Sequence, residues 1–421
     1  DRLRSRGLGD VYKRQTMDNP YFYVFCGFHH FSYNEDNSKN DKEMERMTMS
    51  NLQTPFRYDF VGSFLRPEKL KKARRQFNEG KIDAAALKKV EDEAITELVS
   101  KIKELGYHVI TDGEFRRATW HLDFMWGFDG IGHTPTKTGL PFHGEAAMVD
   151  DTYIVGKIGL TGEHPFVDHF RFVKALEDEN TVAKQTIPSP AQFLAQFTMP
   201  FNRGCTEKHY PNEQELVNDI VAAYGKVIDD LYAAGCRNLQ LDDCTWGMFA
   251  DKIGHTLYGT TREGIVEFQK AHKDINDKVI ANAPKDMIIN THVCRGNFHS
   301  TYASEGAYDS VADILFGEEN VNAYFLEFDD ERSGGFAPLA KVSGEKKVVL
   351  GLITTKSPVL EDKQLVIDRI HDAAKYIPLE RLYLSPQCGF ASCEIGNKLT
   401  EEEQWAKLRL VKEVAEEVWG K

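Results

Sequence analysis

From residue 56 onward, short apolar runs rich in β-branched residues alternate with longer amphipathic stretches, and this alternation constrains the fold more than any other feature. Such alternation is typical of α/β proteins with a parallel sheet. The runs that fit buried strands are 59–64, 108–114, 182–187, 238–243, 287–294, 322–329, 347–353 and 381–387. Eight strands, each followed by a helix, predict a closed (βα)8 TIM barrel. An open doubly wound sheet is the alternative, but no GxGxxG turn follows the first strand.

The stretches between these runs carry helix signals. Residues 83–106 and 212–235 repeat apolar side chains at spacings of three and four and stop at a glycine, while 400–420 begins with a threonine followed by glutamates. Only 115–181 interrupts the alternation, because it is too long for an ordinary connection. We expect an insertion there, after the second strand and over one face of the barrel. With no second domain or repeat in view, residues 56–421 should form a single barrel.

The N-terminal 55 residues lack this pattern. They include the polar, aperiodic stretch "NEDNSKNDKEMERM", and the chain begins without methionine. Polar segments without apolar periodicity cannot bury enough surface to order themselves. We therefore expect residues 1–55 to be a disordered or non-native arm, and we assign it no function.

Composition excludes several classes of protein. The chain of 421 residues is 41% hydrophobic, which suffices for a large core, and its net charge of -13 argues against general binding of nucleic acid or an anionic membrane. It has neither an apolar run long enough to span a membrane nor a secretory leader pattern. Seven sparse cysteines do not predict a disulfide framework. We expect a cytoplasmic protein that acts on small molecules.

Polar side chains end most of the predicted strands. In a barrel, the carboxyl ends of the strands meet at one face, where chemistry is carried out. His292 and Cys294 close the fifth run, and because they are two apart, both side chains point to the same face. Glu327 ends the sixth run and Cys388 follows the eighth. One imidazole, two thiols and one carboxylate suit Zn²⁺ better than Mg²⁺ or Ca²⁺.

A buried, hydrogen-bonded pair is the alternative for an isolated HxC, and the ligand types at two further strand ends favour the metal. Cys236, Cys244 and Cys393 have no comparable setting, so we expect them to be structural.

Six stretches together resemble one family. "DFVGSFLRP", "LGYHVITDGEFRR", "NLQLDD", "INTHVCRGN", "FLEFDDERSG" and "SPQCGF" are similar, in order and spacing, to the catalytic barrel of cobalamin-independent methionine synthases. The resemblance covers roughly residues 56 to 418 and is strongest to the short, single-barrel bacterial relatives. It implies a (βα)8 barrel that transfers a methyl group from 5-methyltetrahydrofolate to the thiol of homocysteine, giving methionine.

The resemblance also implies roles for individual residues. The family's zinc ligands correspond to His292, Cys294, Glu327 and Cys388. The segment that grips the amino acid's carboxylate corresponds to Val61, Gly62 and Ser63. The acids that bind the ammonium group correspond to Glu114 and Asp242, for which a salt bridge within the barrel mouth is the alternative.

Two positions depart from the family pattern, both on the side of the methyl donor. "TTKSPV" places Lys356 where the family has a histidine that helps to protonate the donor, and Gln196 stands near the position of a tryptophan that stacks on the pterin. A lysine can serve as the catalytic acid only if burial lowers its pKa. A methylcobalamin protein or a methylated sulfur compound is therefore the alternative donor.

Two other functions remain as alternatives. A metal-dependent hydrolase on the same barrel would need an HxH motif after the first strand, and "FVGSF" has none. A non-catalytic barrel that stores zinc or binds amino acids is the other alternative.

Overall fold

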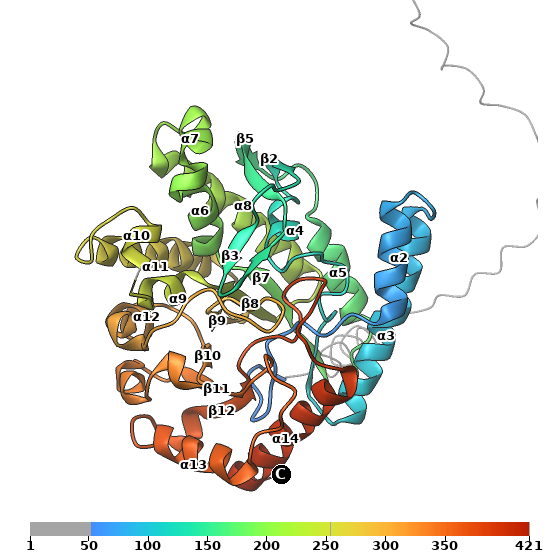
Figure 1. The fold of residues 1–421 in the computed structure, drawn as a ribbon, viewed down its shortest axis with the longest axis vertical. Helices are drawn as coiled ribbons and strands as arrows, with labels where there is room; N and C mark the ends of the chain where they lie inside the picture. The colour runs from blue at the N-terminus through green and yellow to red at the C-terminus, as the bar shows by residue number, and fades with distance from the viewer. Residues whose placement is uncertain (1–51, 253, 421) are drawn as a thin grey trace, which may run out of the picture. The chain divides into compact units, whose positions relative to one another are not determined.

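The structure is a computed structural model that describes residues 52–252 and 254–420. Six parallel strands form one sheet in the order β12-β11-β10-β9-β8-β7, with helices around it (Figure 1). The strands are β7 (Gln185–Pro188), β8 (Asn238–Asp243), β9 (Ile288–Val293), β10 (Ala323–Glu327), β11 (Lys347–Ile353) and β12 (Leu382–Pro386). Strands that follow one another in the chain are thus neighbours in the sheet.

Two further strand positions complete the ring. β1 (Val109–Ile110) pairs in parallel with β6 (Val182–Ala183), which leads through Lys184 into β7. The segment before β1 lies against β12, where Tyr58 forms a bridge with Leu384. The predicted (βα)8 barrel is therefore confirmed.

The first predicted strand, 59–64, is the one that the structure does not assign as a strand. Side chains take the place of a backbone ladder here: the Gln240 amide donates to the carbonyl of Val61, and the Thr111 hydroxyl donates to that of Gly62. The segment stays extended but leaves the regular hydrogen-bond pattern. The runs 238–243 and 347–353 coincide with β8 and β11, while 287–294, 322–329 and 381–387 extend one or two residues beyond the observed strands.

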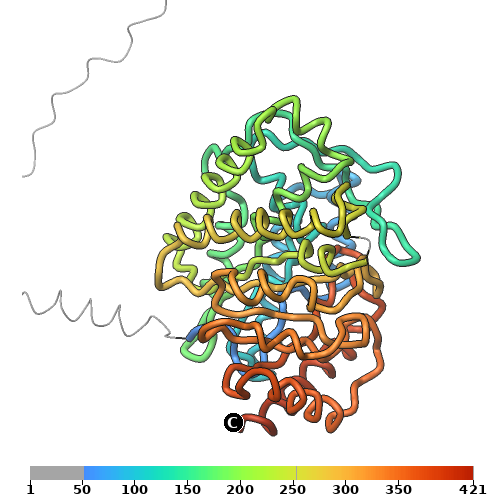
Figure 2. The backbone as a smooth tube through the Cα atoms, turned by 90° about the vertical axis from the view of Figure 1, so that its left-hand side faces the viewer, coloured from blue at the N-terminus to red at the C-terminus, as the bar shows by residue number. Residues whose placement is uncertain are grey.

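Helices cover the outside of the ring, and Figure 2 shows several of them packed in successive rows. The predicted helices 83–106, 212–235 and 400–420 are observed as α3 (Ala84–Glu104), α8 (Glu213–Ala233) and α14 (Glu401–Trp419). Each begins after a side-chain cap, and Thr400 forms a full capping box with Glu403. The others are α2 (Glu68–Asn78), α5 (Pro165–Lys174), α6 (Pro190–Thr198), α7 (Pro200–His209), α9 (Thr245–Ala250), α10 (Gly254–Leu257), α11 (Ile265–Asn282), α12 (Ala312–Glu318) and α13 (Lys363–Ala373).

The connection from β10 to β11 departs from the expected helix. It holds two short 3-10 turns, Glu331–Ser333 and Ala337–Lys341. Gly334 adopts a φ of 72° and Pro338 lacks a backbone donor, so a continuous α-helix cannot form between them.

The interior of the barrel is unusually polar. Two large apolar clusters fill the space around the sheet, but only Val61, Phe325, Val349 and Tyr383 form an apolar cluster within the ring. Near them lies a fully buried ion pair between Lys184 and Asp59, whose Nζ and Oδ1 atoms are 3.1 Å apart. Buried charges of this kind need partners, so the interior is held by directed bonds rather than by packing alone.

The predicted insertion is observed between β1 and α5. It contains α4 (Leu122–Met125), the antiparallel pair β2 (Asp129–Thr134) and β5 (Asp151–Gly159), and the hairpin β3 (Leu140–Phe142) with β4 (Glu145–Ala147). α5, within the predicted range 115–181, belongs to the outer layer of barrel helices (Figure 1).

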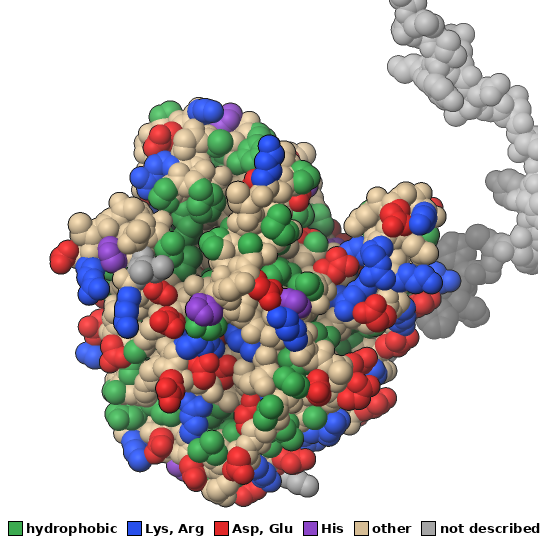
Figure 3. Space-filling view, viewed as in Figure 1, with side chains coloured by type: hydrophobic (Ala, Val, Ile, Leu, Met, Phe, Trp, Pro, Cys, Tyr) green, Lys and Arg blue, Asp and Glu red, His purple; other side chains and the backbone are tan. Residues whose placement is uncertain are grey.

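The β3–β4 hairpin reaches across the mouth of the barrel. Its Glu145 carboxylate pairs with His299, in the loop after β9, and with Lys398, in the loop after β12, each at 2.9 Å. The His143 N–H donates to the carbonyl of Tyr302 at 2.8 Å. In the space-filling view, acidic, basic and histidine side chains gather near the centre of this face (Figure 3). The insertion therefore covers the carboxyl ends of the strands.

Residues 1–51 of the predicted arm lie outside the described residues. The chain is already packed at Thr54, which is buried and whose backbone N–H donates to Asn238 Oδ1 at 2.9 Å. Within the described residues, no helix is both long and apolar enough to span a membrane. The six cysteines of this part are all free, in agreement with the sequence analysis.

Candidate metal centre and substrate site

The four residues expected to bind metal come together at the carboxyl ends of the strands. His292 and Cys294 come from the end of β9, Glu327 ends β10, and Cys388 follows β12. One ligand atom from each of these buried side chains lies within 4.8 Å of the others. The structure thus assembles the whole predicted set from three parts of the ring.

His292 is oriented by the neighbouring strand. Its Nδ1 lies 3.2 Å from the carbonyl oxygen of Phe325 on β10, which can only accept a hydrogen bond. Nδ1 therefore carries the hydrogen, and Nε2 is left with a free lone pair. Nε2 is buried with no hydrogen bond of ordinary length to a described residue, and His292 interacts with the neighbouring Cys388 thiol. A histidine held in this way through its far nitrogen is the usual arrangement at metal sites.

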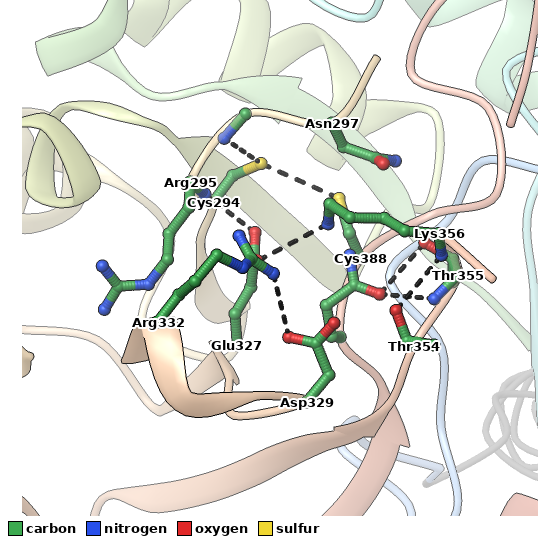
Figure 4. Close-up of polar contacts among 12 residues, drawn as sticks. Cys294, Arg295, Asn297, Glu327, Asp329, Arg332, Thr354, Thr355, Lys356 and Cys388 are labelled. Atoms are coloured by element: carbon green, nitrogen blue, oxygen red, sulfur yellow. Dashed lines mark hydrogen bonds and ion pairs between the residues drawn. The ribbon is translucent and has the colours of Figure 1, made fainter. Parts of the chain in front are cut away.

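The two thiols lie close together, with Cys294 Sγ and Cys388 Sγ 3.8 Å apart (Figure 4). The Gly296 N–H donates to Cys294 Sγ at 3.2 Å. The pKa of Cys294 is raised well above its usual range by hydrogen bonding with Cys244, by burial and by nearby Glu327. Hydrogen bonding with Cys294 and burial do the same to the pKa of Cys388. Two thiolates here require a positive charge among them, which a divalent cation supplies.

Glu327 presents one free oxygen to the cluster. Its Oε1 accepts a hydrogen bond from the Arg295 N–H at 2.8 Å. Its buried Oε2 has no hydrogen-bond donor, and the nearest described cation is the Lys356 ammonium, 3.7 Å away. The free nitrogen, the free carboxylate oxygen and the two thiols make a donor set that fits Zn²⁺.

Lys356, which follows β11, points toward Glu327 (Figure 4). Burial acts to lower the pKa of Lys356, but the charges of Glu327, Asp329 and Cys388 outweigh burial, and its pKa is raised above the usual value. The negative charges of Glu327 and Cys388 set the direction of this shift, and a cation bound to them would oppose it. Lys356 is a buried positive charge beside the ligand cluster.

Val61, Gly62 and Ser63 form one wall next to the cluster. Gly62 has a φ of 156°, and a Cβ atom there would lie 2.8 Å from Cγ2 of Thr186, so only glycine fits. The Ser63 carbonyl accepts a hydrogen bond from the Phe390 N–H at 2.9 Å. This wall is thereby fixed against the loop that carries Cys388.

Glu114 and Asp242 are both buried at the same mouth, and burial raises the pKa of each. Burial raises the pKa of Glu114 to about 7, and Asp242 adds to the rise. Burial likewise raises the pKa of Asp242 to about 7. Glu114 holds a φ of 61°, a strained conformation for a residue with a side chain. Strain and raised pKa values mark this pair as a functional candidate.

A salt bridge within the barrel mouth, the alternative role for these acids, is present for Glu114 but, among the described residues, not for Asp242. Glu114 Oε1 lies 3.3 Å from the Arg117 guanidinium, but its Oε2 is buried without a partner. Asp242 Oδ1 accepts from the Gln240 amide at 2.8 Å, and Asp242 makes no ion pair within the described residues. One oxygen of Glu114 is thus unsatisfied, which suits a bound ammonium group.

Some residues of the site escaped the sequence analysis. Cys244, expected to be structural, hydrogen-bonds with Cys294, while Cys236 does have the structural setting predicted for it, buried against the carbonyl of Asn238. Gln240 contacts both Asp242 and Val61. Its position two residues before Asp242 on a strand is the signal that could have found it, because such residues share a face.

The fold and the site together define a barrel enzyme with a ligand cluster at its strand ends, and known proteins give the family. Residues 198–417 match the family model for the catalytic domain of cobalamin-independent synthase. YxjG of Bacillus subtilis, an uncharacterised protein, is 43% identical over 388 residues, covering 91% of this chain and 100% of that protein. A methionine synthase of Saccharolobus solfataricus is 25% identical over 336 residues, covering 78% of this chain and 86% of that protein.

Solved structures agree. A Listeria monocytogenes protein, provisionally assigned as a vitamin-B12-independent methionine synthase, has a TM-score of 0.69 at 38% identity, covering 88% of this chain and 100% of that chain. A B12-independent methionine synthase from Shewanella, in complex with selenomethionine, has a TM-score of 0.62 at 17% identity, covering 85% and 96%. The chain belongs to the cobalamin-independent methionine synthase family. It is a methyltransferase with a TIM-barrel fold.

Replacing one thiol tests the ligand set. We expect Cys388→Ser to lower zinc affinity by more than the roughly 10- to 100-fold typical of losing an outer-shell partner, because a hydroxyl is a poor substitute for a thiolate. Zinc content after dialysis against a chelator measures this loss. Cys236→Ser, at a buried cysteine outside the cluster, is the matched control. Equal retention of zinc by both variants would remove Cys388 from the ligand set.

Proposed function

We propose that this enzyme transfers a methyl group to the thiol of homocysteine, giving methionine, with Zn²⁺ at the ligand cluster and 5-methyltetrahydrofolate as the donor. One observation carries the proposal: the four metal-ligand side chains and the acid pair Glu114 and Asp242 lie at the carboxyl ends of the same ring of strands. A substrate with a thiol at one end and an ammonium group at the other matches both. The relatives named methionine synthase support this choice of substrate.

The ammonium group and the carboxylate of homocysteine would be held by two different sets of residues. Glu114 and Asp242 accept hydrogen bonds from the ammonium group, which offsets their burial. The backbone of Val61 and Gly62 and the hydroxyl of Ser63 face the carboxylate. The zwitterion is thereby oriented by both of its charged groups.

His292, Cys294, Glu327 and Cys388 would hold the metal. A thiol with an ordinary pKa near about 8.5 is mostly protonated at neutral pH, and bound Zn²⁺ would supply the charge that keeps the substrate sulfur as a thiolate. Backbone groups of Phe325, Arg295 and Gly296 hydrogen-bond to three of the four side chains, His292, Glu327 and Cys294, and hold them in place. The β3–β4 hairpin covers the mouth and limits the access of water.

The methyl donor has a second candidate, and Lys356 favours it. The nitrogen of methyltetrahydrofolate has to be protonated before it can leave, which calls for an acid. Lys356 occupies this position 3.7 Å from Glu327, and to act as that acid it would have to give up the charge that pairs with this carboxylate. A donor whose methyl group already sits on a good leaving group, such as a methylated sulfur compound or a methylcobalamin protein, needs no such acid.

The other functions have less support. The family assignment disfavours a metal-dependent hydrolase and a non-catalytic barrel. We also propose that the enzyme acts in the cytoplasm, since free cysteines at the site and a thiol substrate both require a reducing compartment.

The proposal is tested by supplying each donor in turn. Purified, zinc-loaded enzyme is incubated with L-homocysteine and 5-methyltetrahydrofolate, S-methylmethionine or methylcobalamin, and methionine is measured by mass spectrometry. We expect methionine from the folate donor, and loss of the product in Cys294→Ser. Formation from another donor alone would replace the folate, and no methionine from any of the three would overturn the proposed function.

The role of Lys356 is tested by two substitutions. We expect Lys356→Met to lower kcat by about 100-fold, the scale of a catalytic group, with the KM for homocysteine within about twofold. Lys356→Arg keeps the charge but cannot release a proton, because the guanidinium stays protonated. Retained activity in the arginine variant is expected if Lys356 acts through its positive charge beside Glu327. An arginine variant as inactive as the methionine variant would restore proton donation as the role of Lys356.

The two acids predict a pH dependence of acceptor binding. The pKa of each is raised to about 7, so below that pH they bind protons and lose the charge that attracts the ammonium group. We expect the KM for homocysteine to rise by about tenfold or more as the pH falls from about 8 to about 6. Asp242→Asn should have a high KM with a weaker pH dependence. A KM that is flat over this range in the wild-type enzyme would contradict the assignment.

A further inference from the structure

Gln240 connects the two ends of the amino-acid site. It lies on β8 two residues before Asp242, so both side chains point into the barrel, and it is completely buried. Its Nε2 donates to Asp242 Oδ1 at 2.8 Å and to the carbonyl of Val61 at 2.9 Å. A primary amide carries two hydrogens, so both are used. One side chain therefore fixes an acid relative to the opposite wall.

The orientation of this amide is set by its partners. Both groups facing Nε2 are acceptors, so a flipped amide would place its oxygen against a carboxylate and a carbonyl. The Gln240 oxygen itself has no partner among the described residues. The two hydrogen bonds that its Nε2 donates therefore hold the side chain in place.

The same contacts leave the substrate-facing atoms free. Gln240 donates to Asp242 Oδ1, and no hydrogen bond joins a described residue to Asp242 Oδ2. The Val61 carbonyl lies in the segment that has left the backbone ladder, so the amide supplies the bond that a neighbouring strand would otherwise provide. Thr186 limits movement of Gly62 from another side, 2.8 Å from where a Cβ would stand. Gln240 and Thr186 thus fix the distance between Asp242 and the segment that contains Val61 and Gly62.

We propose that Gln240 is a positioning residue that sets the spacing between the ammonium and carboxylate subsites, and so makes the enzyme select thiols that carry an α-amino-acid group. This inference rests on the proposed function. Gln240 acts through Asp242 and Val61 and does not touch the substrate. A thiol without the amino-acid group depends on the metal cluster alone, and its reaction is indifferent to Gln240.

The decisive experiment compares two acceptors in two variants. Gln240→Glu keeps the shape but places a carboxylate against Asp242, and Gln240→Met keeps the length without any donor. We expect the KM for L-homocysteine to rise by about 10- to 100-fold, the scale of losing a hydrogen bond to a charged group. For 2-mercaptoethanol, kcat/KM should stay within about twofold, because neither subsite is used. Selectivity between the two thiols should therefore collapse.

The matched control is Gln269→Met, at another buried glutamine, which lies on α11 outside the site. Its Nε2 donates to the Ser310 carbonyl at 3.4 Å. Thermal unfolding of every variant identifies a misfolded one, and the isosteric Gln240→Glu decides if Gln240→Met does not fold. Calorimetric titration of zinc-loaded protein with L-methionine gives a readout without turnover. Its affinity should fall by the same factor, with zinc content unchanged.

A double-mutant cycle tests the route of action. If Gln240 acts through Asp242, adding Gln240→Met to Asp242→Asn should cost less than Gln240→Met costs in the wild-type enzyme. Fully additive losses, or wild-type selectivity in a folded Gln240 variant, would overturn the inference. Failure of the proposed function is distinguishable, since it would appear as a wild-type enzyme that methylates neither thiol.

Discussion

Closure of the parallel ring, where the segment around Tyr58 meets β12, is the constraint on which the site depends. The Asp59 N–H donates to the carbonyl of Leu384 at 3.0 Å and joins the start of the barrel to its last strand. Four residues beyond each partner lie Ser63 and Cys388, on the two sides of this seam. A Cβ atom at Gly389 would lie 1.9 Å from the Ser63 hydroxyl oxygen, so the seam tolerates only glycine there. The proposed wall for the amino acid and one proposed ligand for the metal are therefore placed by the same contact.

The polar interior of the barrel carries this placement to the other strands. Burying the Lys184 and Asp59 charges and the Gln240 amide costs free energy that apolar side chains would not incur. In return each group fixes a neighbour by a directed bond: Lys184 donates to the carbonyl of Phe60 at 2.5 Å, and Gln240 to that of Val61. The irregular first segment is thus held by side chains that rise from beneath the site. These side-chain bonds explain why the segment departs from strand geometry, and they also hold it as the proposed binding wall.

Much of the fold and the clustering of the four candidate ligands could be predicted from sequence because they depend on local periodicity. The same-face spacing of His292 and Cys294 follows from strand geometry, and the barrel then brings Glu327 and Cys388 to them. The hydrogen bond of Cys244 with Cys294 could not be predicted, because Cys244 lies beyond the end of β8, where alternation no longer gives direction. The pKa of Lys356 was equally out of reach, since burial and three surrounding charges act on it in opposite directions.

At both ends of the site, the surroundings favour the protonated forms of ionisable side chains. At one end, burial favours the protonated forms of Glu114 and Asp242; at the other, crowding favours the protonated forms of Cys294 and Cys388. Under the proposed function each end would be relieved by a cation, the substrate's ammonium group in one case and a metal ion in the other, because a nearby positive charge stabilises the ionised forms. The protein already places one buried cation, Lys356, beside the metal end. At the acid end Arg117 lies 3.3 Å from Glu114 Oε1, while Oε2 has no hydrogen-bond partner within the described residues and is the atom left to accept from a bound ammonium group under the proposed function.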